Sequence, residues 1–107
     1  MAKALISRGS YAGDDILLVH SAQQGDGMAF DELVRRHAGK AFRIAMHILA
    51  SREDAEDVVQ ESFLKVFQYL NRFEERSLFA TWLTRIVVNT SLFRLRQMKR
   101  SAPIAPG

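Results

Sequence analysis

The stretch SLFATWLTRIVVNTSLFRLRQMKR, from Ser77 to Arg100, decides the fold because it combines an apolar face with a run of cations. Read at helical spacing, its large side chains predict one broad buried face: Leu78, Phe79, Trp82, Leu83, Ile86, Thr90 and Phe93. A second stripe beside it carries Arg85, Asn89, Leu92, Arg96 and Lys99. Such a helix can pack on a core and offer cations and an amide to a polyanion. An ordinary surface helix has the same pattern, so the rest of the chain must decide between a nucleic-acid-binding helix and a surface helix without a ligand.

The length and composition bound the class of protein. A chain of 107 residues suffices for one small domain with one core. It has no cysteine, which excludes disulfides and thiolate metal sites and suits a reducing compartment. No apolar run approaches the ~20 residues that cross a bilayer, and residues 1–13 hold too short an apolar core for a secretory signal. We therefore expect a cytoplasmic protein without membrane insertion.

The charges are separated along the chain. Between Glu53 and Glu61 there are five carboxylates and no cation, whereas from Arg76 to Arg100 there are six basic residues and no acidic one. This separation indicates two partners of opposite character, although solvated faces also cluster charge by chance.

Helical periodicity continues upstream and predicts an all-α, compact bundle of three to four helices. We expect residues 1–13 to be a flexible lead, residues 14–100 the helical domain, and residues 101–107 the start of a linker or tail. A short helix capped by Asp14 or Asp15 should end at Gly25. A long helix follows, whose inward stripe is Phe30, Leu33, Val34, His37, Ala41, Ile44, Ala45 and Ile48.

Two further positions give local expectations. Gly39 interrupts the long helix and predicts a close helix crossing or a bend. Ser51 reads as the N-cap of a third helix, with Asp54 in a position typical of a capping box, and this helix should end near Asn71. A polar link, residues 72–76, then leads into the last helix.

Catalytic and metal-binding chemistry has little support in the sequence. The carboxylates of the third helix could hold magnesium, as in all-α nucleotide hydrolases, but a second acidic pair on a facing helix would be needed. His37 lies on the inward stripe and is expected to be a hydrogen-bonded core residue, whereas His20 and His47 are expected at the surface. No metal site, cofactor or catalytic residue is therefore assigned.

The third helix carries a polar stripe opposite its core face, with an apolar residue inside it. The stripe comprises Asp57, Gln60, Glu61, Leu64 and Gln68. Singly exposed leucines such as Leu64 are common. A small apolar anchor within a polar rim is also how a helix docks on another protein.

Two segments together resemble a known family. DAEDVVQESFLKVFQYLNRF (54–73) followed by TWLTRIVVNTSLFRLRQMKR (81–100) is similar to region 2 of the bacterial extracytoplasmic-function, or group 4, sigma factors. QQGDGMAFDELVRRH (23–37) is similar to the opening helices of that family. The resemblance covers roughly residues 14–100. It implies a non-enzymatic domain that docks on the β′ clamp helices of RNA polymerase and recognises and melts the −10 promoter element.

The resemblance also implies residue roles and partners. The polymerase-docking positions would be Asp54, Asp57, Gln60, Glu61, Leu64 and Gln68. The positions that contact the non-template single strand would be Phe73, Arg85, Asn89, Leu92, Arg96, Lys99 and Arg100, with Phe73 and Asn89 around the pocket for a flipped-out base. An anti-sigma protein would be a further partner.

The link departs from the family pattern. Family members usually have a glycine and a basic residue after the aromatic, whereas here Glu74, Glu75 and Arg76 follow Phe73. The family's second helix-turn-helix domain, for the −35 element, would lie beyond residue 107. The rival hypotheses are a helical protein-interaction domain that binds no nucleic acid and, more distantly, a magnesium-dependent nucleotide hydrolase.

Overall fold

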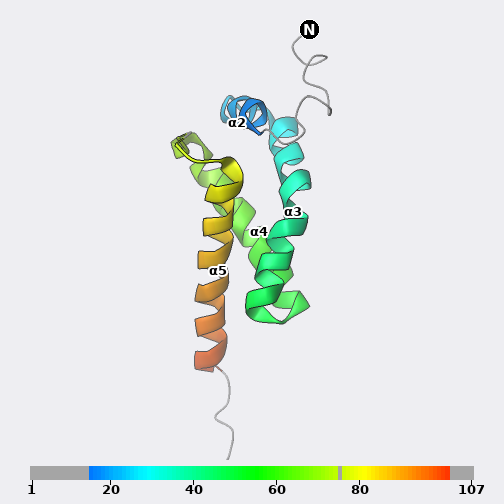
Figure 1. Ribbon diagram of the computed structural model, residues 1–107, viewed down its shortest axis with the longest axis vertical. Helices are drawn as coiled ribbons and strands as arrows, with labels where there is room; N and C mark the ends of the chain where they lie inside the picture. The colour runs from blue at the N-terminus through cyan, green and yellow to red at the C-terminus, as the bar shows by residue number, and fades with distance from the viewer. Residues whose placement is uncertain (1–14, 75, 102–107) are drawn as a thin grey trace, which may run out of the picture.

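The protein is a bundle of three long helices with a short helix across one end. The computed structural model describes residues 15–74 and 76–101, and every regular element within these ranges is helical. Helices α3 (Gly27–Leu49), α4 (Arg52–Tyr69) and α5 (Phe79–Ser101) pack on one another, while α2 (Ile16–Gln23) packs on α3 (Figure 1). The prediction of an all-α bundle is confirmed.

Some expectations fall outside the described residues. They concern the lead of residues 1–13, Asp14 as a cap, the acidic Glu75 of the link, and the tail of residues 102–107. Ser101, which was expected to begin the linker, is instead the last residue of α5. No helix among the described residues combines the length and the apolar character that a membrane span needs.

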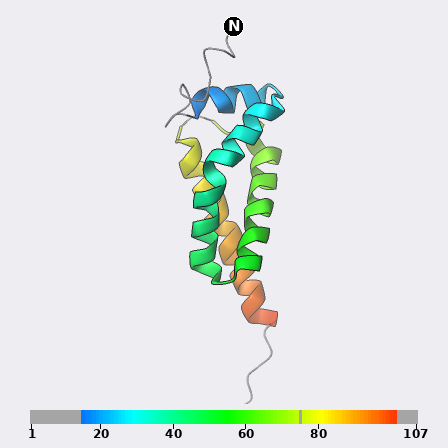
Figure 2. The same ribbon diagram turned by 90° about the vertical axis from the view of Figure 1, so that its right-hand side faces the viewer.

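The three long helices alternate in direction. Helix α4 runs opposite to α3 and α5, and the last part of α5 extends past the turn that joins α3 to α4 (Figure 2). That turn is short because Ala50 adopts a left-handed conformation, with φ 54°, and its N–H bonds to Met46 O. Ser51 Oγ then accepts a hydrogen bond from Asp54 N at 3.3 Å, so the predicted N-cap of α4 is confirmed.

The core lies between the long helices. Its least exposed side chains include Leu33, Ala45, Val58, Val66 and Val87, all at 0% exposure. The apolar face expected for α5 is too wide, because Leu78 and Phe93 are 72% and 52% exposed. Phe93 follows Asn89 by four residues and so shares its outward face.

Helix α2 is held on α3 by a polar cluster around Asp15. Asp15 precedes α2 but makes no side-chain cap; its carboxylate lies 2.8 Å from His37 Nε2 and 3.3 Å from Arg36 Nη1. His37 is therefore the hydrogen-bonded inner residue that was predicted. Glu32 extends the cluster because Arg36 also donates to its carboxylate, at 3.1 Å. The hydrogen bond from Arg35, together with that from Arg36, lowers the pKa of the Glu32 carboxyl to about 2.

Gly39 does not mark a close helix crossing, and α3 continues through it, so a bend at this residue stays a prediction. It is exposed, and a Cβ added there would meet only Arg43 Nη1, at 3.6 Å, which is ordinary van der Waals contact with a flexible group. Gly25 differs, because its φ of 96° is a conformation that other residues rarely adopt.

We predict that Gly39→Ala stabilises the protein by about 0.5–1 kcal/mol, because alanine restricts the unfolded chain and fits the helix. Thermal unfolding should show a rise in Tm of a few degrees. Gly25→Ala is the matched control and should lower Tm, because a side chain strains the backbone there. A fall in Tm for Gly39→Ala would contradict the assignment of open space around that residue.

Candidate nucleic-acid and protein interfaces

The outward face of α5 is cationic. Arg85, Asn89, Leu92, Arg96, Lys99 and Arg100 are all exposed, as the sequence predicts. Among residues 15–74 and 76–101, none of the four cations on this face lies within ion-pair distance of a carboxylate. Their charge is therefore presented to solvent, along the face on which Asn89 offers an amide. This arrangement suits a phosphate backbone.

A hollow of about 310 Å³ opens between α4 and α5 beside Asn89. It is lined by Lys65, Tyr69, Trp82, Ile86, Asn89 and Thr90. Lys65 Nζ donates to Thr90 Oγ1 at 2.9 Å, so the ammonium is fixed near the hollow. Aromatic and aliphatic walls with an amide and an ammonium suit a planar ring that has polar edges.

Phe73 forms a support beneath this hollow. Its ring is 8% exposed and stacks on Trp82 with ring centroids 4.7 Å apart and an interplanar angle of 30°. Phe79 meets the Phe73 ring edge-on at 6.1 Å. In this arrangement Phe73 positions Trp82, and contact between Phe73 and a base stays a prediction. Trp82 itself is half-buried and forms part of the hollow's wall.

The link that precedes α5 is anchored by α2. Gln23 Nε2 donates to Leu70 O at 2.9 Å and to Phe73 O at 3.2 Å. These bonds join α2 to the segment that carries Phe73. No sequence pattern points to Gln23, because the two carbonyls that it binds lie about fifty residues further along the chain.

The outward face of α4 is polar with apolar anchors. Asp57, Gln60, Leu64 and Gln68 are exposed, and Leu64 is 61% exposed. Phe67, which sequence analysis missed, is 64% exposed and meets Phe30 edge-on at 5.3 Å. Its spacing of three residues from Leu64 was the available signal. Leu64 and Phe67 together form an apolar centre within a polar rim, as protein-docking surfaces do.

Arg94 connects the acidic side of α4 to α5. Its guanidinium donates to Asp54 Oδ1 at 3.1 Å and lies 3.8 Å from both Asp57 Oδ2 and Glu61 Oε1. Three expected docking carboxylates therefore converge on one cation of the neighbouring helix. No local sequence pattern predicts this role for Arg94, because its partners are on another helix. Asp54 and Glu61 are half-buried as a result, whereas Asp57 remains exposed.

We predict that Arg94→Ala lowers the free energy of unfolding by about 1–2 kcal/mol, because it removes a charge-assisted bond and leaves three carboxylates close together. Urea denaturation measures the effect. Arg52→Ala is the control: its pair with Glu56, at 3.5 Å, is exposed on both sides, and its loss should cost less than about 0.5 kcal/mol. Equal losses for the two variants would contradict the assigned role of Arg94.

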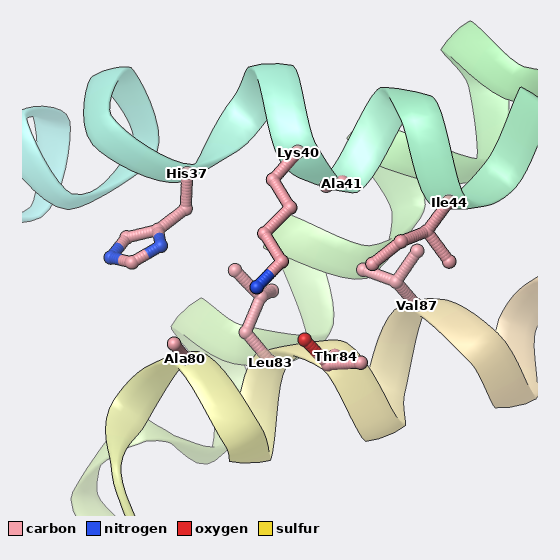
Figure 3. A pocket seen from close by; sticks show the side chains of 8 residues that line it. All are labelled: His37, Lys40, Ala41, Ile44, Ala80, Leu83, Thr84 and Val87. Atoms are coloured by element: carbon pink, nitrogen blue, oxygen red, sulfur yellow. The ribbon is translucent and has the colours of Figure 1, made fainter.

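The groove between α3 and α5 is too small to be a site. Lys40 of α3 extends across it toward Leu83 and Thr84 of α5 (Figure 3), whereas the His37 ring lies to one side, within 2.8 Å of the Asp15 carboxylate. Its volume of about 10 Å³ is scarcely enough for one water molecule. Within the described part of the chain, no three histidine or carboxylate side chains are grouped so that they could hold a metal ion.

Comparison with known proteins gives concordant matches. The family model described as Sigma-70 region 2 matches residues 33–101. The ECF RNA polymerase sigma-E factor of Haemophilus influenzae is 43% identical over 89 residues, which are 83% of this chain and 47% of that protein. The ECF RNA polymerase sigma factor SigM of Mycobacterium tuberculosis is 39% identical over 92 residues, or 86% and 45% of the two chains. The chain thus spans about half the length of the curated relatives it matches.

Two solved structures share the fold. The NMR structure of an engineered region 2 of sigmaE in complex with GTAAAA has a TM-score of 0.76 and 38% identity, and the match covers 84% of this chain and 94% of that one. CnrH in complex with the cytosolic domain of CnrY has a TM-score of 0.68 and 26% identity, over 84% and 67% of the two chains. The likeness extends over most of the helical part of this chain.

Proposed function

The chain belongs to the Sigma-70 region 2 family, and we propose that it is the part of an extracytoplasmic-function sigma factor that joins RNA polymerase to the −10 promoter element. The observation that carries the proposal is the hollow that Asn89 lines between α4 and α5, on the helix that also presents the exposed cations Arg85, Arg96, Lys99 and Arg100. Relatives named as sigma factors, and a neighbour of known structure bound to GTAAAA, support it.

Melting follows from the chemistry of this surface. A base leaves its stack at a cost of a few kcal/mol, and a pocket that stacks and hydrogen-bonds that base offsets the cost. Trp82 and Ile86 would supply apolar contact, while Asn89 would read a polar edge. Arg85, Arg96, Lys99 and Arg100 would hold the phosphates of the non-template strand. The role is non-enzymatic.

The outward face of α4 would dock on the β′ clamp helices of the polymerase core. Leu64 and Phe67 supply the apolar centre, and Asp57, Gln60 and Gln68 the polar rim. Asp54 and Glu61 would support this docking face indirectly, because their contacts with Arg94 connect α4 to α5. We also propose a cytoplasmic location, where polymerase and DNA meet, and an anti-sigma partner, as the CnrH–CnrY complex suggests by analogy.

We predict that the domain binds single-stranded DNA with a sequence preference and with an affinity that falls steeply as salt rises. Asn89→Ala should flatten the preference at one position, because it removes a base contact, whereas Arg96→Ala should weaken all sequences alike. Fluorescence anisotropy with GTAAAA and its single-base variants at several salt concentrations measures both effects. Absence of binding at low salt would favour the protein-interaction hypothesis.

We predict that Leu64→Asp abolishes binding to a β′ clamp-helix fragment, because it places a charge at the centre of the docking face. Helicity should be unchanged, since Leu64 is exposed. Leu17→Asp is the matched control: Leu17 is also exposed but lies on α2, and its substitution should leave docking intact. Isothermal titration calorimetry on the three proteins checks the prediction, and equal affinities would contradict the assigned face.

A further inference from the structure

Phe93 is an exposed aromatic residue that neither the core nor the proposed function uses. Its side chain is 52% exposed although the sequence places it on the buried face of the last helix. A large apolar ring in contact with water is unfavourable unless a ligand covers it, and single exposed rings are too common to be evidence alone. The surroundings of the ring decide what it could bind.

The position of Phe93 on α5 relates it to the candidate pocket. Asn89, which lines the hollow between α4 and α5, precedes Phe93 by four residues and so lies one helical turn away on the same face. Four residues of helix rise about 6 Å. A strand whose base enters the hollow would therefore bring its neighbouring nucleotide within reach of the Phe93 ring.

The charges around Phe93 favour a polyanion over a protein helix. The Arg96 guanidinium lies over the Phe93 ring, 6.0 Å from its centroid, and Arg100 follows one turn later on α5. Helix α5 contains no acidic residue. The other strongly exposed phenylalanine among the described residues, Phe67, differs: its ring packs edge-on against Phe30, and no guanidinium lies over it.

We propose that Phe93 is a second base-contacting residue, a stacking platform for the nucleotide adjacent to the one read by Asn89. This inference rests on the proposed function, because it requires that a single strand follow α5. A ring stacks on any base, so Phe93 adds affinity for the unpaired strand without selecting its sequence. Duplex bases are already stacked on one another, and Phe93 therefore favours the melted strand over the duplex.

The test measures binding of single-stranded hexanucleotides, GTAAAA and variants with one abasic site at each position, to the 107-residue chain. Phe93→Ala should weaken binding of the intact strand about tenfold, and Phe93→Trp should retain it. Phe93→Leu should lose as much as Phe93→Ala, since leucine is apolar but cannot stack. Leu17→Ala is the control, at an exposed apolar residue of α2 outside both proposed faces, and should bind as the unaltered protein does.

The abasic strands locate the contact. Phe93→Ala should cause no further loss when one particular base is missing, and that base should neighbour the one whose identity Asn89→Ala ceases to read. Full affinity in Phe93→Leu, or an equal loss with every abasic strand, would overturn the inference. If the unaltered protein binds no single strand, the proposed function itself fails; if it binds and Phe93→Ala is unchanged, only this inference fails.

Discussion

The mutual packing of three helices is the constraint on which the rest of the structure depends. Because α3, α4 and α5 each pack against the other two, each helix has one outward face left for solvent or for partners. Small residues line the packed faces: Ala41, Ala45, Ala55, Ser62 and Ser91 are at most 2% exposed. Larger side chains at these positions would push the helices apart and open the core. The two interfaces proposed for this chain lie on the outward faces of α4 and α5 and at the hollow between them.

The two proposed interfaces are neighbours, and charged side chains connect them. Arg94 of α5 lies among the carboxylates of α4, and Lys65 of α4 donates to Thr90 of α5 beside the hollow. Lys65 also lies 3.5 Å from Glu61, so the contacts run from the acidic face to the pocket. Such side chains help to fix the angle between the two helices, and with it the position of the face proposed to bind a strand relative to the face proposed to bind protein.

The sequence was sufficient for much of the fold. Periodicity predicted the helices and the N-cap at Ser51, since these depend on residues close together in the chain. Periodicity placed Phe93 on the buried face of α5, whereas its side chain is 52% exposed. Steps of three and four residues define a stripe that becomes broader along the helix, and Phe93 lies at its solvent-exposed edge. Which edge of that stripe faces the core depends on the position of α4, which no local pattern contains.

The candidate sites could be predicted only in part: the exposure of their residues could, but contacts between helices could not. The exposure of Asn89, Arg96, Asp57 and Leu64 follows from helical spacing and agrees with expectation. The roles of Arg94, Gln23 and Asp15 could not be found, because each depends on a partner on another helix or in the link before α5. Asp15 shows the reason most clearly: a nearby cation and imidazole compete for its carboxylate with the helix terminus that the local sequence offers.

The two hydrogen bonds from Gln23 have a consequence for dynamics. They connect α2 to the carbonyl groups at Leu70 and Phe73, and Phe73 in turn stacks on Trp82 in the wall of the hollow. A ligand that binds only while Trp82 keeps this position would disfavour local opening of α2, and by thermodynamic reciprocity an attached α2 would strengthen that ligand's binding. Amide exchange in α2 would then report on occupancy of a cavity that α2 does not line.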